Sequence, residues 1–172
     1  MRDAPWKVKI KMTKIQKTNA ARLLDKAKID YQLVPYQVDE SDLSAIHVAR
    51  QLGELVEQVF KTLVLKGDKT GYFACIIPGN AELDLKKTAK ISGNKSCNMI
   101  PMKDLLTVTG YIRGACSPIG MKKPLPTFIH ETATQFETIY VSAGQRGLQI
   151  RIAPTDLIAQ IRAEVDSLIV EE

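Results

Sequence analysis

Residues 110–123 are the part of the chain best suited to hold a ligand, because three glycines, one proline and a basic pair fall within the run GYIRGACSPIGMKK. Glycine accepts positive φ and lets a ligand approach bare backbone. A loop of this composition can turn its N–H groups toward a carbonyl or a phosphate. A plain connection between two strands is the alternative, and composition alone leaves both interpretations open.

Lys61 is unexpected in a run that otherwise predicts a buried strand, VFKTLVLK at residues 59–66. Side chains alternate between the two faces of a strand, so Lys61 shares its face with Val59 and Leu63. Burying an ammonium there is costly unless the strand faces a pocket or an anion. A lysine at the edge of the sheet that extends its amine outward into water is the other explanation.

The sequence offers little for nucleophilic catalysis. It contains neither the GxSxG run of serine hydrolases nor a phosphate-binding P-loop. Cys116 with His130 as its base is one conceivable pair, although scattered cysteines more often pack as small hydrophobic residues. What remains is a site made of backbone N–H groups from residues 110–120, the Lys61 amine and polar groups of the turn SAGQRG at residues 142–147. Such a set can stabilise a developing oxyanion without supplying a nucleophile.

The composition also bears on metals and on the cellular compartment. Three widely spaced cysteines and two histidines include no CxxC or HxxxH spacing, so we expect no structural zinc site. An odd number of cysteines fits a reducing compartment. No apolar run approaches the roughly 20 residues that cross a bilayer, and the amino terminus lacks the apolar core of a signal peptide. The sequence therefore predicts a cytoplasmic protein with no membrane segment.

The formal net charge of +5 favours an anionic partner. The lysines form three loose groups, a distribution that suits phosphate contacts along a strand of nucleic acid. A solvated basic surface without a partner is the alternative. The groups are Lys7, Lys9, Lys11, Lys14 and Lys17; Lys86, Lys87, Lys90 and Lys95; and Lys122 and Lys123.

A chain of 172 residues is long enough for one domain with a sizeable core. Met12 offers a second plausible start, so residues 1–11 are expected to be an extension or leader ahead of a domain at 12–172. Strands and helices mix without a regular βαβ alternation, which predicts an α+β fold: a single domain with a mixed, curled sheet. Expected helices cover residues 18–28, 45–53, 85–93, 102–106 and 155–168, and expected strands cover 31–38, 59–66, 72–78, 96–100, 127–130, 138–142 and 148–152.

Several details of these elements are specific enough to check. Thr18, Ser44 and Asp84 are expected to cap the first three helices. Pro35 interrupts the first strand and must therefore lie at a sheet edge or a bulge. The turn GDKTG joins the strands at 59–66 and 72–78 into a hairpin. His47 lies within the second helix, where an exposed or capping role is expected rather than a catalytic one.

Four motifs, taken together, resemble the YbaK/EbsC family of aminoacyl-tRNA deacylases. They are VFKTLVL at residues 59–65, LDLKKTAK at 83–90, TGYIRGACSPIGMKKPLPT at 109–127 and IYVSAGQRGLQI at 139–150. The resemblance runs from about Met12 to Leu168. It implies a mixed, barrel-like sheet surrounded by helices, similar to the editing domain of bacterial prolyl-tRNA synthetases.

The resemblance also implies an activity. Members of the family act in trans-editing: they cleave the ester between a wrongly attached amino acid and tRNA, chiefly cysteine on tRNA for proline, Cys-tRNA(Pro), and in some cases Cys-tRNA(Cys). They work in association with prolyl-tRNA synthetase and use no metal or organic cofactor. The cysteinyl substrate is thought to supply its own nucleophile, its thiol attacking the ester carbonyl to leave a thiolactone.

The resemblance further assigns roles to particular residues. Lys61, Gly114 and Ser142 match the positions that carry catalysis in the family, with Lys61 at the terminal ribose or phosphate, Gly114 at the carbonyl and Ser142 at the α-amino or hydroxyl groups. The residues expected to contact substrate are Tyr36, Thr62, Ile112, Arg113, Gly144 and Gln149.

Gln149 departs from the pattern, since some members carry an acidic residue there. Without that carboxylate, a role for it as amine anchor or proton acceptor does not transfer in the same form, so two alternatives stay open beside the Cys-tRNA deacylase. One is a deacylase acting on Ala-tRNA(Pro). The other is a non-catalytic module that binds tRNA or the synthetase.

Overall fold

The computed structural model describes residues 4–7 and 15–171. These residues form an α+β unit with two sheets, as the mixed order of elements predicted. Of the expected extension at residues 1–11, only residues 4–7 are described; the other seven lie outside the described residues. Across the described ranges, no helix is long and apolar enough to cross a membrane.

The smaller sheet has three antiparallel strands in the order β1 (Tyr31–Pro35), β7 (Leu148–Ile152) and β6 (Ile139–Ser142). Pro35 ends β1 at the edge of this sheet, opposite Leu148, as expected for a residue without an N–H group. Helices α1 (Asn19–Lys26) and α5 (Pro154–Ile161) bury Leu24 and Leu157 in the core that this sheet shares with β3 and β5.

The larger sheet has five strands in the order β4 (Cys97–Met99), β2 (Phe60–Gly67), β3 (Gly71–Pro78), β5 (Thr127–His130) and β8 (Glu164–Asp166). The expected hairpin of β2 and β3 is present, and β5 and β8 are added in parallel, so the sheet is mixed. Helix α3 (Leu85–Ser92) buries Ala89 against the face that carries Leu65 and Phe73.

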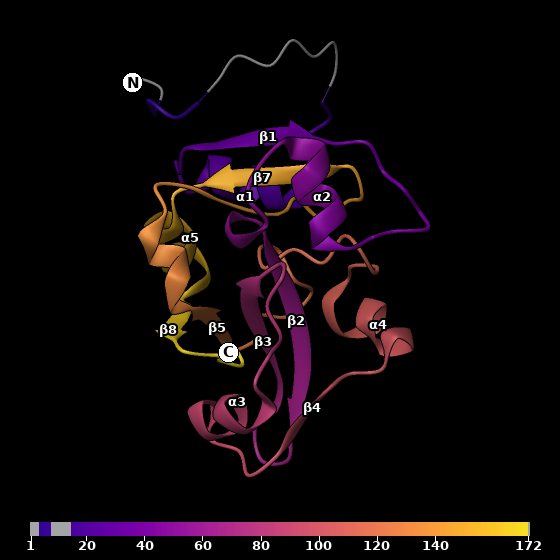
Figure 1. Cartoon of the computed structure of the whole chain (residues 1–172), viewed down its shortest axis with the longest axis vertical. Helices are drawn as coiled ribbons and strands as arrows, with labels where there is room; N and C mark the ends of the chain where they lie inside the picture. Colours follow the sequence, from indigo (N-terminus) through magenta and orange to yellow (C-terminus); the bar gives the residue numbers. More distant parts are fainter. Residues whose placement is uncertain (1–3, 8–14, 172) are drawn as a thin grey trace.

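The expectation of one curled, barrel-like sheet is only partly right. Among the described residues the two sheets are separate and meet through a single bridge between Val59 and Tyr140. Figure 1 shows the smaller sheet lying across one end of the larger one. Within the described chain the sheets do not close into a barrel, because β4 and β8 leave open edges on one sheet and β1 leaves one on the other, while β6 reaches the larger sheet only through Tyr140.

The helix ends follow the predicted capping chemistry. The side chains of Thr18, Ser44 and Asp84 each accept a hydrogen bond from a backbone N–H in the first turn of the helix that follows, which for Ser44 is α2 (Ala45–Leu52). Gly53 ends α2 in the left-handed conformation, with φ of 69°. The remaining short helices are η1 (Val56–Gln58), η2 (Met102–Asp104), α4 (Leu105–Thr109) and η3 (Glu131–Gln135).

The last helix is shorter than the sequence suggested. It ends at Ile161, where Arg162 adopts a left-handed φ of 54°, and residues 164–166 form β8 instead of continuing the helix to residue 168. The apolar spacing was misread because Leu168, fully buried, packs in the core beside α3, whereas Leu157 packs in the core beside the smaller sheet. Apolar residues that enter two different cores thus fall, in the sequence, at the spacing of one amphipathic helix.

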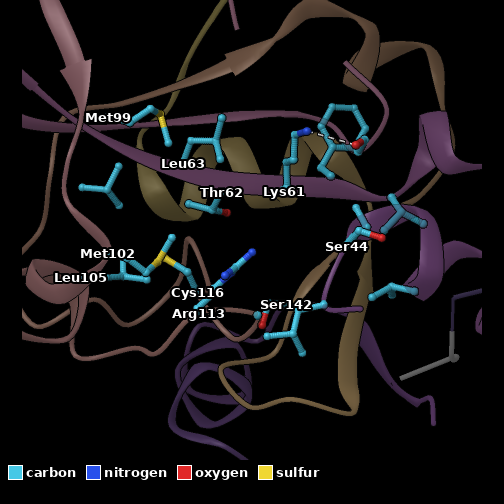
Figure 2. Close-up of a pocket in the computed structure, with 18 of the residues that line it drawn as sticks. Ser44, Lys61, Thr62, Leu63, Met99, Met102, Leu105, Arg113, Cys116 and Ser142 are labelled. Atoms are coloured by element: carbon cyan, nitrogen blue, oxygen red, sulfur yellow. Dashed lines mark hydrogen bonds between the residues drawn. The ribbon is translucent and has the colours of Figure 1, made fainter. Parts of the chain in front are cut away.

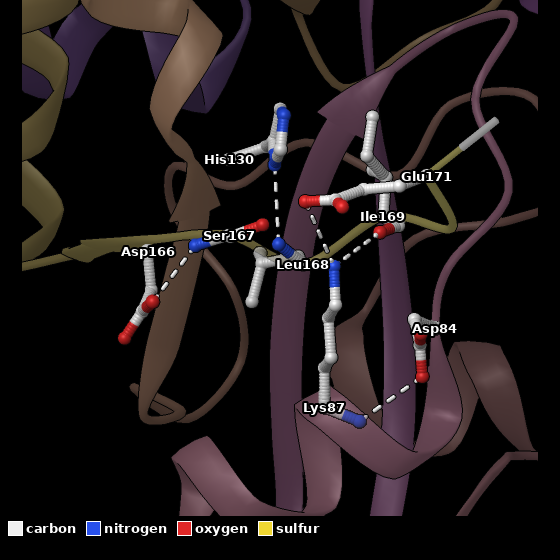
Figure 3. A network of polar contacts seen from close by, with 8 residues as sticks. All are labelled: Asp84, Lys87, His130, Asp166, Ser167, Leu168, Ile169 and Glu171. Carbon is white, nitrogen blue, oxygen red and sulfur yellow. Dashed lines mark hydrogen bonds and ion pairs between the residues drawn. The ribbon is translucent and has the colours of Figure 1, made fainter.

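The carboxyl-terminal segment after β8 is tied to β5 and α3 by backbone and side-chain contacts (Figure 3). His130 Nδ1 accepts the buried N–H of Leu168 at 3.1 Å, and Lys87 Nζ donates to the carbonyl of Ile169 at 3.2 Å. Lys87 also pairs with Glu171 at 3.4 Å. His130 is therefore an acceptor and must be neutral at Nδ1 for this contact to form.

This contact makes stability depend on pH. Burial lowers the pKa of His130, with Glu131 acting against the shift and Lys87 reinforcing it. The unfolded chain binds a proton near pH 6.5, whereas the folded chain binds it only at lower pH. The free energy of unfolding therefore falls as the pH drops below about 6.5 and levels off below the folded pKa.

Urea unfolding at about pH 7.5 and about pH 5.5 measures this loss. We expect the His130→Asn variant, whose side-chain oxygen can still accept the Leu168 N–H, to lose less stability between the two pH values than the wild-type protein. Equal losses in the two proteins would contradict the assignment.

Candidate active site

A cavity of about 340 Å³ lies where β2, the start of α2, the ends of β6 and β7 and the loop at residues 110–123 meet. In Figure 2 the side chains of Lys61 and Thr62 leave β2 in opposite directions: Thr62 points toward Arg113 and Ser142, and Lys61 points toward the carbonyl of Gly79. Six of the nine site residues expected from the sequence line this cavity, although they come from distant parts of the chain. They are Lys61, Thr62, Arg113, Gly114, Ser142 and Gln149.

Lys61 is half-buried on β2, and its Nζ donates a hydrogen bond to the carbonyl of Gly79 at 3.1 Å. Of the two explanations for this lysine, the structure supports the one in which it faces a pocket. Burial lowers the pKa of Lys61, and the carboxylate of Glu82 partly opposes this. No acidic residue is among the described residues that line the cavity. An anionic or strongly polar ligand would therefore stabilise the ammonium form.

Gly79, whose carbonyl binds Lys61, allows α2 to pack close to β3. Sequence reasoning did not identify this glycine. A Cβ at this position would lie 2.5 Å from the Cβ of Ala45 and 2.9 Å from the carbonyl oxygen of Val59. The close approach of α2 to the end of the β2–β3 hairpin thus requires glycine. A glycine after a strand ordinarily signals a turn, which is why the pattern carried no sign of this contact.

The loop at residues 110–123 is irregular, and Gly114 lies on the cavity wall with φ of +82°. Arg146 Nε donates to the carbonyl of Arg113 at 2.9 Å, which anchors the loop to the turn that follows β6. A Cβ on Gly114 would lie 3.3 Å from Leu43 Cδ1 and 3.4 Å from Arg146 Nε. Both the backbone conformation and the space favour glycine at this position.

Three polar side chains on the wall offer hydrogen-bonding atoms to a ligand. Ser142 and Gln149 face each other across the β6–β7 pair, and Ser142 Oγ accepts the N–H of Gly144 at 3.1 Å. Gln149 Oε1 and Thr62 Oγ1 are buried and have no hydrogen-bond partner within the described part of the chain. Buried polar atoms are nearly always paired in folded proteins. Four such side-chain atoms are unpaired in the described chain, and the two that line the cavity, on Thr62 and Gln149, are placed to receive a partner from a ligand.

The cysteine–histidine pair considered from the sequence is not formed. Cys116 lines the cavity, but burial raises the pKa of its thiol to about 11, with a hydrogen bond to Thr109 acting in the other direction. His130 is absent from the cavity lining, and its Nδ1 is occupied by the N–H of Leu168. Among the described residues, the cavity lining therefore includes no histidine or carboxylate that could take the proton from Cys116 and generate the thiolate that a cysteine nucleophile needs.

Three of the expected residues do not line the cavity. Tyr36 packs beside α2, against the cluster that contains Val48 and Tyr140. Ile112 is 49% exposed. The N–H of Gly144 donates to Ser142 Oγ, and a Cβ on Gly144 would meet the ring of Tyr111. Gly144 is thus placed to hold the Ser142 hydroxyl.

Most of the remaining wall is apolar and was missed, because an apolar residue gives the same sequence signal whether it faces a cavity or a core. These residues are Leu43, Ala45, Val48, Val59, Phe60, Leu63, Val64, Met99, Ile100, Met102 and Leu105. In the part of the chain that the structure describes, no three His, Cys, Asp or Glu residues are grouped so as to hold a metal ion.

Comparisons with known proteins agree with this picture. A model of the aminoacyl-tRNA editing domain family matches residues 40–159. The Enterococcus faecalis protein named "Putative Cys-tRNA(Pro)/Cys-tRNA(Cys) deacylase EbsC" is 48% identical over 157 residues, which cover 91% of this chain and 96% of that protein. A proline–tRNA ligase of Fervidobacterium nodosum is 34% identical over 79 residues, which cover 46% of this chain and 14% of the ligase.

A similar fold is seen in a crystal structure described as "a putative trans-editing enzyme for prolyl tRNA synthetase". It matches with a TM-score of 0.77 at 24% identity and covers 91% of this chain and 100% of that chain. At this level of identity the match concerns the fold alone. Because the family match spans most of the chain and the enterococcal relative aligns over nearly its whole length, the chain belongs to the aminoacyl-tRNA editing domain family.

Proposed function

We propose that this protein is a trans-editing aminoacyl-tRNA deacylase that removes cysteine wrongly attached to tRNA for proline and also accepts cysteine on its own tRNA. One observation carries the proposal: a half-buried lysine and two unpaired buried acceptors line one cavity, and the described residues of its lining include no nucleophile paired with a histidine or carboxylate base. The family and the name of the enterococcal relative support the same substrate class.

Because no protein nucleophile with a base is found among the described residues of the cavity lining, we assign the nucleophile to the substrate. The thiol of the cysteinyl group loses its proton and its sulfur attacks the ester carbonyl carbon, forming a C–S bond. The ester C–O bond then breaks, the terminal ribose oxygen takes up a proton, and a thiolactone leaves together with free tRNA. The protein has to orient the ester and stabilise charge on the carbonyl oxygen, and it needs no nucleophile of its own.

Each lining residue has a role in this reaction. The Lys61 ammonium binds the terminal ribose or phosphate, the Gly114 N–H binds the carbonyl oxygen, and Ser142 binds the α-amino group. Thr62 Oγ1 and Gln149 Oε1, both unpaired and buried, supply further acceptors for that amino group. A neutral amide at Gln149 can accept a hydrogen bond from an ammonium, although it lacks the charge of a carboxylate.

Specificity for tRNA is proposed to come in part from association with prolyl-tRNA synthetase in the cytoplasm. The similarity to a segment of proline–tRNA ligases supports this partner. We further propose that residues 12–172 carry the activity and that residues 1–11 are an extension outside it. Of that extension, the described residues 4–7 do not line the cavity; Trp6 stacks against Arg151 instead, with the guanidinium 5.6 Å from its ring centre.

The function is tested by following amino acid release from Cys-tRNA(Pro) and Ala-tRNA(Pro), each with and without prolyl-tRNA synthetase. We expect cysteine to be released by the protein alone and faster when the synthetase is present. Faster release of alanine would identify an Ala-tRNA deacylase. Binding of tRNA without release of either amino acid would identify a non-catalytic module.

Lys61→Ala tests the central residue in this assay. Because the variant removes the only cation on the β2 wall of the cavity, we expect kcat/KM for Cys-tRNA(Pro) to fall by about 100-fold or more. Lys66→Ala is the matched control, since Lys66 is exposed on the same strand, does not line the cavity and should behave like the wild-type protein. A near wild-type rate for Lys61→Ala would disprove the role.

Gly114→Ala tests the backbone role of the loop. Gly110 has the same φ of +82°, and a Cβ there would meet only Lys122, at 3.7 Å or more. Alanine in this conformation costs about 1–2 kcal/mol, so both variants should lose stability in urea unfolding, and Gly114→Ala somewhat more because its Cβ also crowds Leu43 and Arg146. We expect only Gly114→Ala to lose deacylation, by about 100-fold. Equal activity of the two variants would show that the loop is a plain connector.

A further inference from the structure

The mouth of the cavity differs in charge on its two sides. On the side of Ser44, which lines the cavity, the preceding loop carries exposed Asp39, Glu40 and Asp42. Hydrogen bonds from Ser41 hold the pKa of Asp39 below its usual value, and those from Ser44 do the same for Asp42. These carboxylates are therefore ionised at neutral pH. We call residues 39–42 the acidic loop.

The opposite side is basic and apolar. Lys103, Arg113 and Lys122 are exposed there, and none of them forms an ion pair within the described ranges of the chain. The Lys122 N–H is bonded to the carbonyl of Thr109 at 2.9 Å, which places Lys122 at the end of α4. Asp104 is the only acidic residue in the run 99–113.

Large apolar side chains lie exposed between these cations. Met99 is 46% exposed, Met102 57% and Leu106 56%, and the two methionines also line the cavity. In Figure 1, α4 stands beside β2, away from the other helices, and Thr109 is its only buried residue. Together, Met99, Met102, Lys103, Leu106, Arg113 and Lys122 form a surface that we call the basic rim.

We propose that the basic rim binds the unpaired 3′ end of the aminoacyl-tRNA where it leaves the cavity, and that the acidic loop keeps the strand off the opposite side. The inference rests on the proposed function, because an ester held in the cavity forces the adjoining nucleotides to cross the mouth on one side. Phosphates contact Lys103, Arg113 and Lys122, and bases lie against Met99, Met102 and Leu106.

The charges around the mouth determine on which side of it the tRNA strand leaves the cavity. A Debye length of about 8 Å at physiological salt means that charges bordering the mouth act on the first nucleotides of the strand. Asp39 and Asp42 repel phosphates on one side, where the third carboxylate, Glu40, is paired with Arg146 at 3.9 Å. On the other side three unpaired cations attract phosphates. Cations interleaved with surfaces on which bases can rest are the usual composition of sites for single-stranded nucleic acid.

A docked protein is the competing occupant, since exposed apolar residues also occur in protein interfaces. Continuity with the cavity favours the nucleic acid, because Met99, Met102 and Arg113 belong to both the cavity wall and the rim. Because the ester is covalently linked to the tRNA strand, the nucleotides next to it must lie against the surface around the mouth of the cavity. Nothing comparable requires a protein partner to bind there.

The experiment compares two double variants with the same change of charge. Lys103→Glu with Lys122→Glu alters the rim, and Lys86→Glu with Lys90→Glu alters exposed residues of α3 that do not line the cavity. One measurement is the dissociation constant for a transcript of tRNA for proline that carries no amino acid, over a range of KCl concentrations. The other is the ratio of kcat/KM for Cys-tRNA(Pro) to that for 3′-cysteinyl-adenosine, which has no phosphates.

We expect the rim variant to bind the transcript about tenfold more weakly, with the slope of log K against log salt reduced by about 0.7 for each lost contact. Its ratio of kcat/KM values should also fall about tenfold, and the α3 variant should stay within about twofold of wild type. Equal effects of both variants would overturn the proposal. So would a loss seen only with prolyl-tRNA synthetase present, which would identify a protein-docking surface.

Failure of the proposed function would look different. The wild-type protein would then release cysteine from neither substrate, and the binding measurement would still decide whether the rim holds the transcript. Thermal unfolding of all the variants shows whether they are folded, and we expect little change because the substituted lysines are exposed.

Discussion

The site depends on a lysine ammonium that is held partly out of water, in a cavity whose described lining contains no carboxylate. Lys61 Nζ has the carbonyl of Gly79 as its partner at 3.1 Å, and the described lining of the cavity contains no acidic residue. A cation so placed lacks full compensation until a ligand supplies negative charge. Gly79 allows α2 to close one wall, and Gly114 allows the loop at residues 110–123 to close another. The cavity is therefore built to receive an anionic or polar group.

Much of the fold could be predicted because its signals are local. Thr18, Ser44 and Asp84 act through side-chain contacts to the next few residues, and the β2–β3 hairpin forms around a turn rich in glycine. The errors concern long-range pairing. Residues 164–166 join the edge of β5 in parallel, and Leu168 enters a different core from Leu157. No local pattern reports which of two cores a residue joins, or that two sheets meet at one bridge instead of closing into a barrel.

For the candidate site, too, the sequence identified residues with a local signal and missed those whose role depends on long-range contacts. Lys61 could be singled out from the sequence because a charge in an apolar strand breaks the pattern, and the loop at residues 110–123 because it is dense in glycine. Within that loop, Gly114 was identified only through the resemblance to the family. Gly79 could not be identified, since its importance lies in contacts with Ala45 and Val59. Gln149 was read as a departure from the family pattern, and the structure adds that its Oε1 is buried and unpaired within the described chain.

The most direct test of the central claim, that the substrate and not the protein supplies the nucleophile, is single-turnover hydrolysis of Cys-tRNA(Pro) and Ser-tRNA(Pro) by the wild-type protein and by Cys116→Ser. We expect both proteins to hydrolyse the cysteinyl ester at rates within about threefold of each other, and the seryl ester at least about 100 times more slowly, because a thiol is a far better nucleophile than a hydroxyl. Loss of cysteinyl hydrolysis in Cys116→Ser, or equal hydrolysis of the two esters, would contradict the claim.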